Sequence, residues 1–128
     1  NLEDNTFYLT GQLDQLKNHP GLKGAVGLKG GGASFENIGS DKIVSGSPEA
    51  DFIARMNQIE GQAFLQAFDT LRGGGQITEI EGKKATQARL RMSRATSEKE
   101  FIKAATEFED IVNTGLERQR KQAKGENP

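Results

Sequence analysis

A glycine-rich joint between two helical segments constrains the fold of this chain more than any other feature. The joint reads Leu71-Arg72-Gly73-Gly74-Gly75-Gln76-Ile77-Thr78. Gly73 stands where a helix C-cap favours a left-handed residue, and Thr78 and Glu81 form a Thr-x-x-Glu capping box that starts the next helix. The joint therefore predicts a helical hairpin over residues 48–93, with Gly73, Gly74 and Gly75 at its hinge.

Start signals and apolar spacing define the other helices. Ser47-Pro48-Glu49 combines an N-cap serine, a first-turn proline and an acid, and helical apolar spacing continues to Leu71 or Arg72. This pattern predicts one continuous central helix. A second capping box, Ser97 to Glu100, opens a long helix over 97–120, and leucine spacing predicts a short helix over about 5–18.

Residues 20–47 are rich in glycine and serine and predict a long irregular segment, with at most a very short strand at 42–45. Lys23 and Lys29 stand among these glycines, but the spacing of a phosphate-binding loop is absent. The predicted fold class is mainly α: the hairpin plus a third long helix, with the short N-terminal helix and the Gly-rich loop wrapped around them. We expect a single domain over 1–120 and a basic, disordered tail over 121–128.

Two glycines within the predicted helices need an explanation. Gly61 and Gly82 both follow Ile-Glu, and each helix-interior glycine costs about 1 kcal/mol relative to alanine. The shared pattern predicts that they are packing glycines, where the two arms of the hairpin approach each other closely.

The apolar content predicts contacts beyond the chain itself. Only 34% of the 128 residues are hydrophobic, and 16 are glycine. The central helix nevertheless carries a broad apolar stripe, wider than one neighbouring helix covers. We therefore expect a protein partner or self-association, with Phe52, Met56, Phe64 and Phe68 as candidate interface residues.

Few residues of this chain are of a type and spacing that would support catalysis. The chain has no cysteine and a single histidine, His19, which excludes thiol chemistry and a multi-histidine metal site. The carboxylate pairs Glu79 with Glu81 and Glu107 with Asp110 fit capping or a solvated helix face better than acid–base catalysis. We predict no enzyme activity, no cofactor, no metal and no small-molecule substrate.

Charge leaves a nucleic-acid alternative open. Seventeen basic and eighteen acidic side chains give a net charge of −1, which argues against a surface built wholly for nucleic acid or anionic lipid. Lys83, Lys84, Arg89 and Arg91 are candidate phosphate contacts, and a solvated basic face is the competing interpretation. No apolar run approaches the ~18 residues of a membrane span, and the sequence shows no signal-peptide pattern.

The run from Gly61 to Thr86, with its Gly-Gly-Gly-Gln-Ile-Thr-Glu core, resembles a segment of bacteriophage and prophage proteins. Some of these are large virion proteins of the tail or DNA-delivery apparatus, and the similarity extends from His19 to Leu116. The resemblance implies a noncatalytic helical structural or assembly module that acts through protein–protein contacts, in the host cytoplasm during assembly or in the virion. A nucleic-acid-associated module of a DNA-delivery protein is the alternative, and an enzyme accessory domain is the remaining one. Because the chain opens at Asn1, we also expect it to be part of a longer protein.

Overall fold

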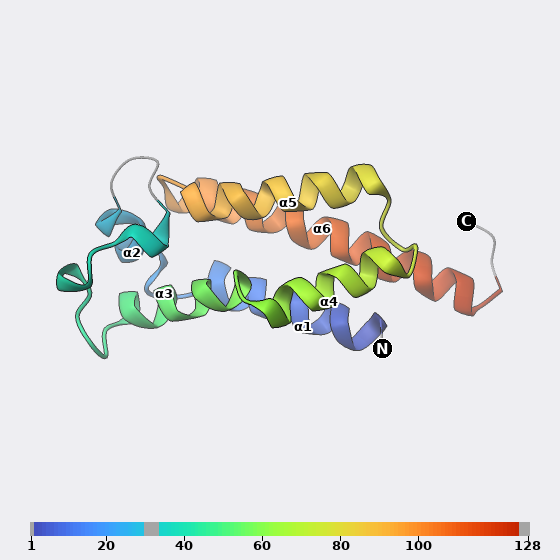
Figure 1. Cartoon of the computed structure of the whole chain (residues 1–128), viewed down its shortest axis with the longest axis horizontal. Helices are drawn as coiled ribbons and strands as arrows, with labels where there is room; N and C mark the ends of the chain where they lie inside the picture. Colours follow the sequence, from blue (N-terminus) through green and yellow to red (C-terminus); the bar gives the residue numbers. More distant parts are fainter. Residues whose placement is uncertain (1, 30–33, 126–128) are drawn as a thin grey trace.

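The computed structural model describes residues 2–29 and 34–125, and these are mainly helical, as predicted (Figure 1). No strand occurs among them. In chain order the elements are α1 (Leu2–Lys17), α2 (Leu22–Leu28), the 3₁₀ turns η1 (Phe35–Asn37) and η2 (Ser40–Lys42), α3 (Pro48–Ile59), α4 (Gln62–Gly73), α5 (Glu79–Arg94) and α6 (Glu98–Ala123). None of the described helices is both long and apolar enough to cross a membrane.

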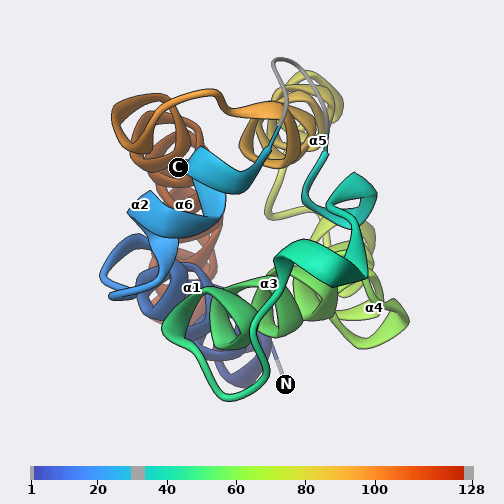
Figure 2. The same ribbon diagram turned by 90° about the vertical axis from the view of Figure 1, so that its left-hand side faces the viewer.

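The long helices form an antiparallel bundle. α1, then α3 continued by α4, then α5 and α6 run side by side, and each reverses the direction of the one before (Figure 1). Seen from the end, α1 and α5 occupy opposite corners, and α2 with the 3₁₀ turns covers that end (Figure 2). α6 packs along both α5 and α1, while α1 also packs on α3 and α4.

This pairing differs from the predicted hairpin. The glycine joint connects α4 to α5, but α5 packs mainly along α6, and α4 packs mainly along α1. α4 and α5, although consecutive in the chain, therefore make few close backbone contacts with each other.

The predicted central helix is broken. α3 ends at Ile59 and α4 begins at Gln62, with Gly61 in an extended conformation as the N-cap of α4 (φ −81°, ψ 168°). A Cβ at Gly61 would lie 3.1 Å from the Gln58 carbonyl oxygen, within the same turn. The prediction that Gly61 packs against the other arm is therefore wrong, because this glycine accommodates a break in the backbone.

Residues 20–47 are more ordered than predicted. They contain α2 and two 3₁₀ turns, and no strand forms at 42–45. The side chains of Leu22 and Ala25, spaced by three residues on α2, are buried, and so is Phe35 of η1. Burial of these side chains outweighs the low helix propensity of the glycines. Residues 30–33, also part of the predicted loop, lie outside the described residues.

Most predicted helix starts are confirmed. The Thr78 hydroxyl accepts from the Glu81 amide at 3.1 Å, and the Glu81 carboxylate accepts from the Thr78 amide at 2.9 Å. Ser47 caps α3 by accepting from the Ala50 amide. The second box is only half formed, since Glu100 accepts from the amide and hydroxyl of Thr96 rather than from the Ser97 amide.

Two helix ends differ from prediction. The left-handed residue of the joint is Gly75 (φ +79°), whereas Gly73 is the last residue of α4 and Gly74 is its C-cap with φ −78°. α6 continues to Ala123, so the first residues of the predicted tail are helical. Residues 126–128 lie outside the described part of the chain.

Candidate functional site

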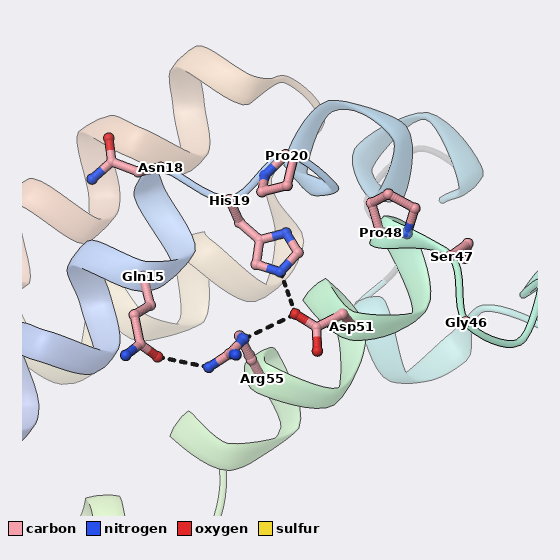
Figure 3. A pocket seen from close by; sticks show the side chains of 9 residues that line it. All are labelled: Gln15, Asn18, His19, Pro20, Gly46, Ser47, Pro48, Asp51 and Arg55. Atoms are coloured by element: carbon pink, nitrogen blue, oxygen red, sulfur yellow. Dashed lines mark hydrogen bonds and ion pairs between the residues drawn. The ribbon is translucent and has the colours of Figure 1, made fainter.

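A wide hollow lies where the turn between α1 and α2, residues 18–21, here called the α1–α2 elbow, meets the start of α3 (Figure 3). It is an open cavity of about 680 Å³, lined by Gln15, Asn18, His19, Pro20, Gly46, Ser47, Pro48, Asp51 and Arg55. This is the first place to look for chemistry, because it contains the only histidine of the chain.

A chain of hydrogen bonds crosses this cavity. His19 Nε2 lies 2.6 Å from Asp51 Oδ2, and the same oxygen accepts from Arg55 Nε at 2.9 Å. Arg55 also donates to Gln15 Oε1 at 2.7 Å (Figure 3). The hydrogen bonds from His19 and then Arg55 hold the pKa of Asp51 below its ordinary value.

The histidine has no ring nitrogen left for catalysis. The Gly21 amide donates to His19 Nδ1 at 2.9 Å, so Nδ1 is unprotonated and Nε2 carries the proton that is shared with Asp51. In a catalytic triad one ring nitrogen faces the nucleophile, and here both are used within the fold. The hydrogen-bond network therefore acts as a structural tie between the elbow and α3.

One carboxylate of each pair considered from the sequence is also engaged in a structural contact. Glu81 is held by Thr78 and Arg118, and Glu107 pairs with Arg91 across the α5–α6 interface. Over residues 2–29 and 34–125, no group of three or more histidine and carboxylate side chains is placed to hold a metal ion.

Lys29 has the most perturbed ammonium group. Its Nζ donates to the carbonyl oxygens of Ser93 and Ala95 at 2.7 and 2.9 Å, and it lies 3.9 Å from the centre of the Phe35 ring. Burial lowers the pKa of Lys29 to about 8, despite the opposing effect of Glu100. The side chain closes the C-terminal end of α5, which is a favourable position for a cation.

The glycine joint is anchored by Arg118 of α6. Arg118 contacts both carboxylate oxygens of Glu81, at 2.5 and 3.0 Å, and donates to the Gln76 carbonyl oxygen at 3.1 Å. The hydrogen bond from Arg118 is the main reason why the pKa of Glu81 falls to about 2. Gly82 lies close by, where a Cβ would come within 3.0 Å of Arg72 Nε. Gly82 thus faces the other arm of the predicted hairpin, through a side chain of α4.

The anchor predicts an acid-sensitive contribution to stability. Because folding lowers the pKa of Glu81 from 4.5 to about 2, this carboxylate stabilises the fold above pH 4.5, and its contribution is lost as pH falls toward 2. Glu81→Gln should reduce the free energy of unfolding by about 1 kcal/mol at pH 7, a value kept small by partial solvent exposure. Urea midpoints at pH 7 and pH 2.5 should show the difference from wild type shrinking at low pH. If the urea midpoints of variant and wild type differ equally at pH 7 and pH 2.5, the stabilising role assigned to the Glu81 carboxylate would be contradicted.

The predicted interface residues are not on the surface. Phe52, Met56, Phe64 and Phe68 are all buried in the core of the bundle. α1 fills the side that was expected to be open, through the buried side chains of Leu9, Leu13 and Leu16. The prediction that these four residues meet a partner is therefore wrong for the folded chain.

The candidate phosphate contacts are divided between two sides of α5. Lys83, Lys84 and Arg91 are exposed, and Lys84 and Arg91 border the α5–α6 groove. Arg89 is half-buried and borders a small hollow between α4 and α5, next to Phe64 and Phe68. The four cations do not form a single patch.

The solvent side of α5 also carries two exposed aliphatic side chains, Ile80 at 68% and Leu90 at 48% exposure. The side chains of Lys83, Lys84 and Arg94 make no hydrogen bond or ion pair with any other described residue. We define the α5 outer face as Ile80, Lys83, Lys84, Gln87, Leu90, Arg91 and Arg94. Three of its cations, Lys83, Lys84 and Arg91, were identified from the sequence, but neither of its exposed aliphatic side chains was.

A second exposed surface, on α1, was missed. Phe7 and Tyr8 are 54% and 37% exposed, and two exposed carboxylates flank them, Asp4 about one turn before and Asp14 about two turns after. Gly11 lies between them, and a Cβ there would meet nothing within 4 Å. These five residues, spaced at three and four along the helix, define the α1 outer face. The only signal in the sequence was an adjacent aromatic pair beside a helix-interior glycine.

Comparison of the chain with models of protein families, with curated proteins and with solved structures finds no match.

Proposed function

We propose that this chain is a noncatalytic helical structural or assembly module of a phage or prophage protein, acting through protein–protein contacts of its outer helix faces. The observation that carries the proposal is the α5 outer face, where two large aliphatic side chains project into solvent among cations. Of these cations, Arg91 pairs with Glu107, whereas the side chains of Lys83, Lys84 and Arg94 have no partner among the described residues. Exposed apolar groups rimmed by charge are typical of interaction sites.

The use of the polar side chains supports a noncatalytic role. His19, Lys29, Glu81 and Arg118 are each engaged in contacts that join separate elements of the bundle. These structural contacts account for the perturbed pKa values of Lys29 and Glu81, so no catalytic role is needed to explain them. The resemblance of Gly61–Thr86 to phage and prophage proteins supplies the class of assembly, and with it the host cytoplasm or the virion as the location.

The nucleic-acid alternative rests on Lys83, Lys84 and Arg94, the unpaired cations of the α5 outer face. Aromatic side chains for base stacking are missing from α5, and exposed aliphatics occupy the places between its cations. Duplex DNA binding at physiological salt that weakens in Lys83→Gln/Lys84→Gln would favour this alternative over a protein partner.

Site-specific photo-crosslinking tests the proposal. A benzoylphenylalanine probe replaces Leu90 in the chain produced in its bacterial host, and the matched control carries the probe at Gln66, an exposed residue of α4. We expect discrete protein adducts from position 90 and none from position 66. The absence of protein adducts at position 90, or adducts to nucleic acid alone, would overturn the proposal.

A further inference from the structure

The two outer faces are chemically complementary. The charges on the α1 outer face are the exposed carboxylates Asp4 and Asp14, and Asp14 also interacts with Glu109 of α6. α5 carries two carboxylates, both in its first turn, and five cations after them. Each face also exposes apolar side chains: an aromatic pair on α1 and two aliphatics on α5.

We propose that a second copy of this chain is a partner: the α1 outer face of one copy docks antiparallel along the α5 outer face of the next. This inference rests on the proposed function and names the contact that the assembly module uses with itself.

The spacing of the residues supports one register. Both helices rise 1.5 Å per residue, so residues at equal separations stay opposed along an antiparallel pair. Setting Tyr8 against Leu90 places Asp4 opposite Arg94 and Asp14 opposite Lys84. In a parallel pair with the same central contact, Asp4 would face the neutral Thr86, and Asp14 would lie beyond the end of α5.

Gly11 supplies an independent argument. A helix-interior glycine costs about 1 kcal/mol relative to alanine, and nothing in the folded chain occupies the space that its side chain would fill. In the proposed register Gly11 faces Gln87, whose longer side chain needs that space. Close approach of a second helix at Gly11 would explain why a glycine stands at this position, since no contact within the single chain requires one.

The positions of the faces determine the kind of assembly. α1 and α5 occupy opposite corners of the bundle, so one copy contacts one neighbour through α1 and another through α5 (Figure 2). Such a heterologous contact repeats into an open chain of copies unless its geometry closes a ring. A single pair of helices gives a small interface, and we expect association to require high local protein concentration.

Disulfide trapping tests the contact and its register, because the natural chain has no cysteine. Gly11→Cys/Gln87→Cys places two thiols opposite each other between copies, whereas within one copy they lie on opposite corners. The matched control, Gly11→Cys/Ile80→Cys, moves the second thiol by seven residues, about 10 Å along the same face and beyond disulfide reach. Mild oxidation of concentrated protein should give a ladder of covalent oligomers for the first variant and mainly monomer for the control.

Charge reversal provides a second readout. In the Gly11→Cys/Gln87→Cys chain, Asp4→Arg alone and Arg94→Asp alone should each reduce the yield of oligomers at least threefold. Combining the two reversals should restore the ladder, because each contact again joins opposite charges. Equal yields for the in-register and control pairs, or no restoration by the combined reversal, would overturn the proposal.

The outcomes separate this inference from the proposed function. Monomer in every disulfide experiment, together with a different protein crosslinked at position 90, would overturn self-association and leave the assembly role standing. The absence of both kinds of product would overturn both.

Discussion

Phe108→Ala should lower the free energy of unfolding by about 3 to 5 kcal/mol, the range for deletion of a buried aromatic side chain. Phe108 of α6 is buried, and its ring centre lies 5.5 Å from that of Phe64 and 5.1 Å from that of Phe68. These contacts join α6 to α4, so removal of the ring leaves a cavity between the two helices.

Thermal and urea unfolding measure this effect, with Phe7→Ala in dilute solution as the matched control. The same atoms are removed at Phe7, but its side chain is more than half exposed, and we expect a change below about 0.5 kcal/mol. Comparable losses for the two variants would show that Phe108 does not connect α4 to α6 as described.

Gly21→Ala should reduce stability by about 3 kcal/mol, at the upper end of the usual range for overpacking. A Cβ at Gly21 would lie 2.1 Å from the Pro48 carbonyl oxygen and 2.8 Å from the Glu49 amide nitrogen. Both atoms belong to the backbone at the start of α3, so the added methyl group must push the elbow and α3 apart. The same shift would disturb the His19–Asp51 hydrogen bond that joins these elements.

Gly11→Ala provides the contrast, because the new methyl group meets nothing within 4 Å and gains helix propensity. We expect Gly11→Ala to raise the stability of dilute protein by up to about 1 kcal/mol. If Gly21→Ala unfolds at the same urea concentration as wild type, that result would contradict the close contact described between Gly21 and the start of α3.

Local signals predicted the helix starts well. Ser47 and the Thr78–Glu81 box act within one turn of the chain, so their geometry is encoded by neighbouring residues. The mainly α fold class was predicted from the spacing of apolar residues, which is also a local property of the sequence. The break at Gly61 was missed because a single interior glycine is compatible with either a weakened helix or a new N-cap.

Tertiary contacts could not be read from the sequence in this way. The burial of Phe64 and Phe68 depends on α1 packing on α4 and on α6 supplying Phe108, and spacing within one helix does not identify its neighbours. The order found in residues 20–47 likewise depends on contacts of Leu22 and Phe35 with distant parts of the chain.

The candidate surface was only partly predictable. Lys83 and Lys84 were identified from charge, since surface position is the usual state of lysine. The exposure of Leu90, Phe7 and Tyr8 was not predicted. The sequence shows that a residue is apolar, but it does not show whether a neighbouring helix covers that residue.

In our proposal the α5 outer face is exposed to solvent in the single chain and is covered by a protein partner in the assembly. Leu90→Cys tests this directly, with Gln66→Cys as the control on an exposed part of α4. The rate of thiol labelling is measured in dilute purified protein and in cells that produce the protein together with its proposed assembly partners. The account predicts similar rates for both cysteines in dilute protein, and at least tenfold slower labelling of position 90 than of position 66 in cells. Equal labelling of the two positions in cells would contradict it.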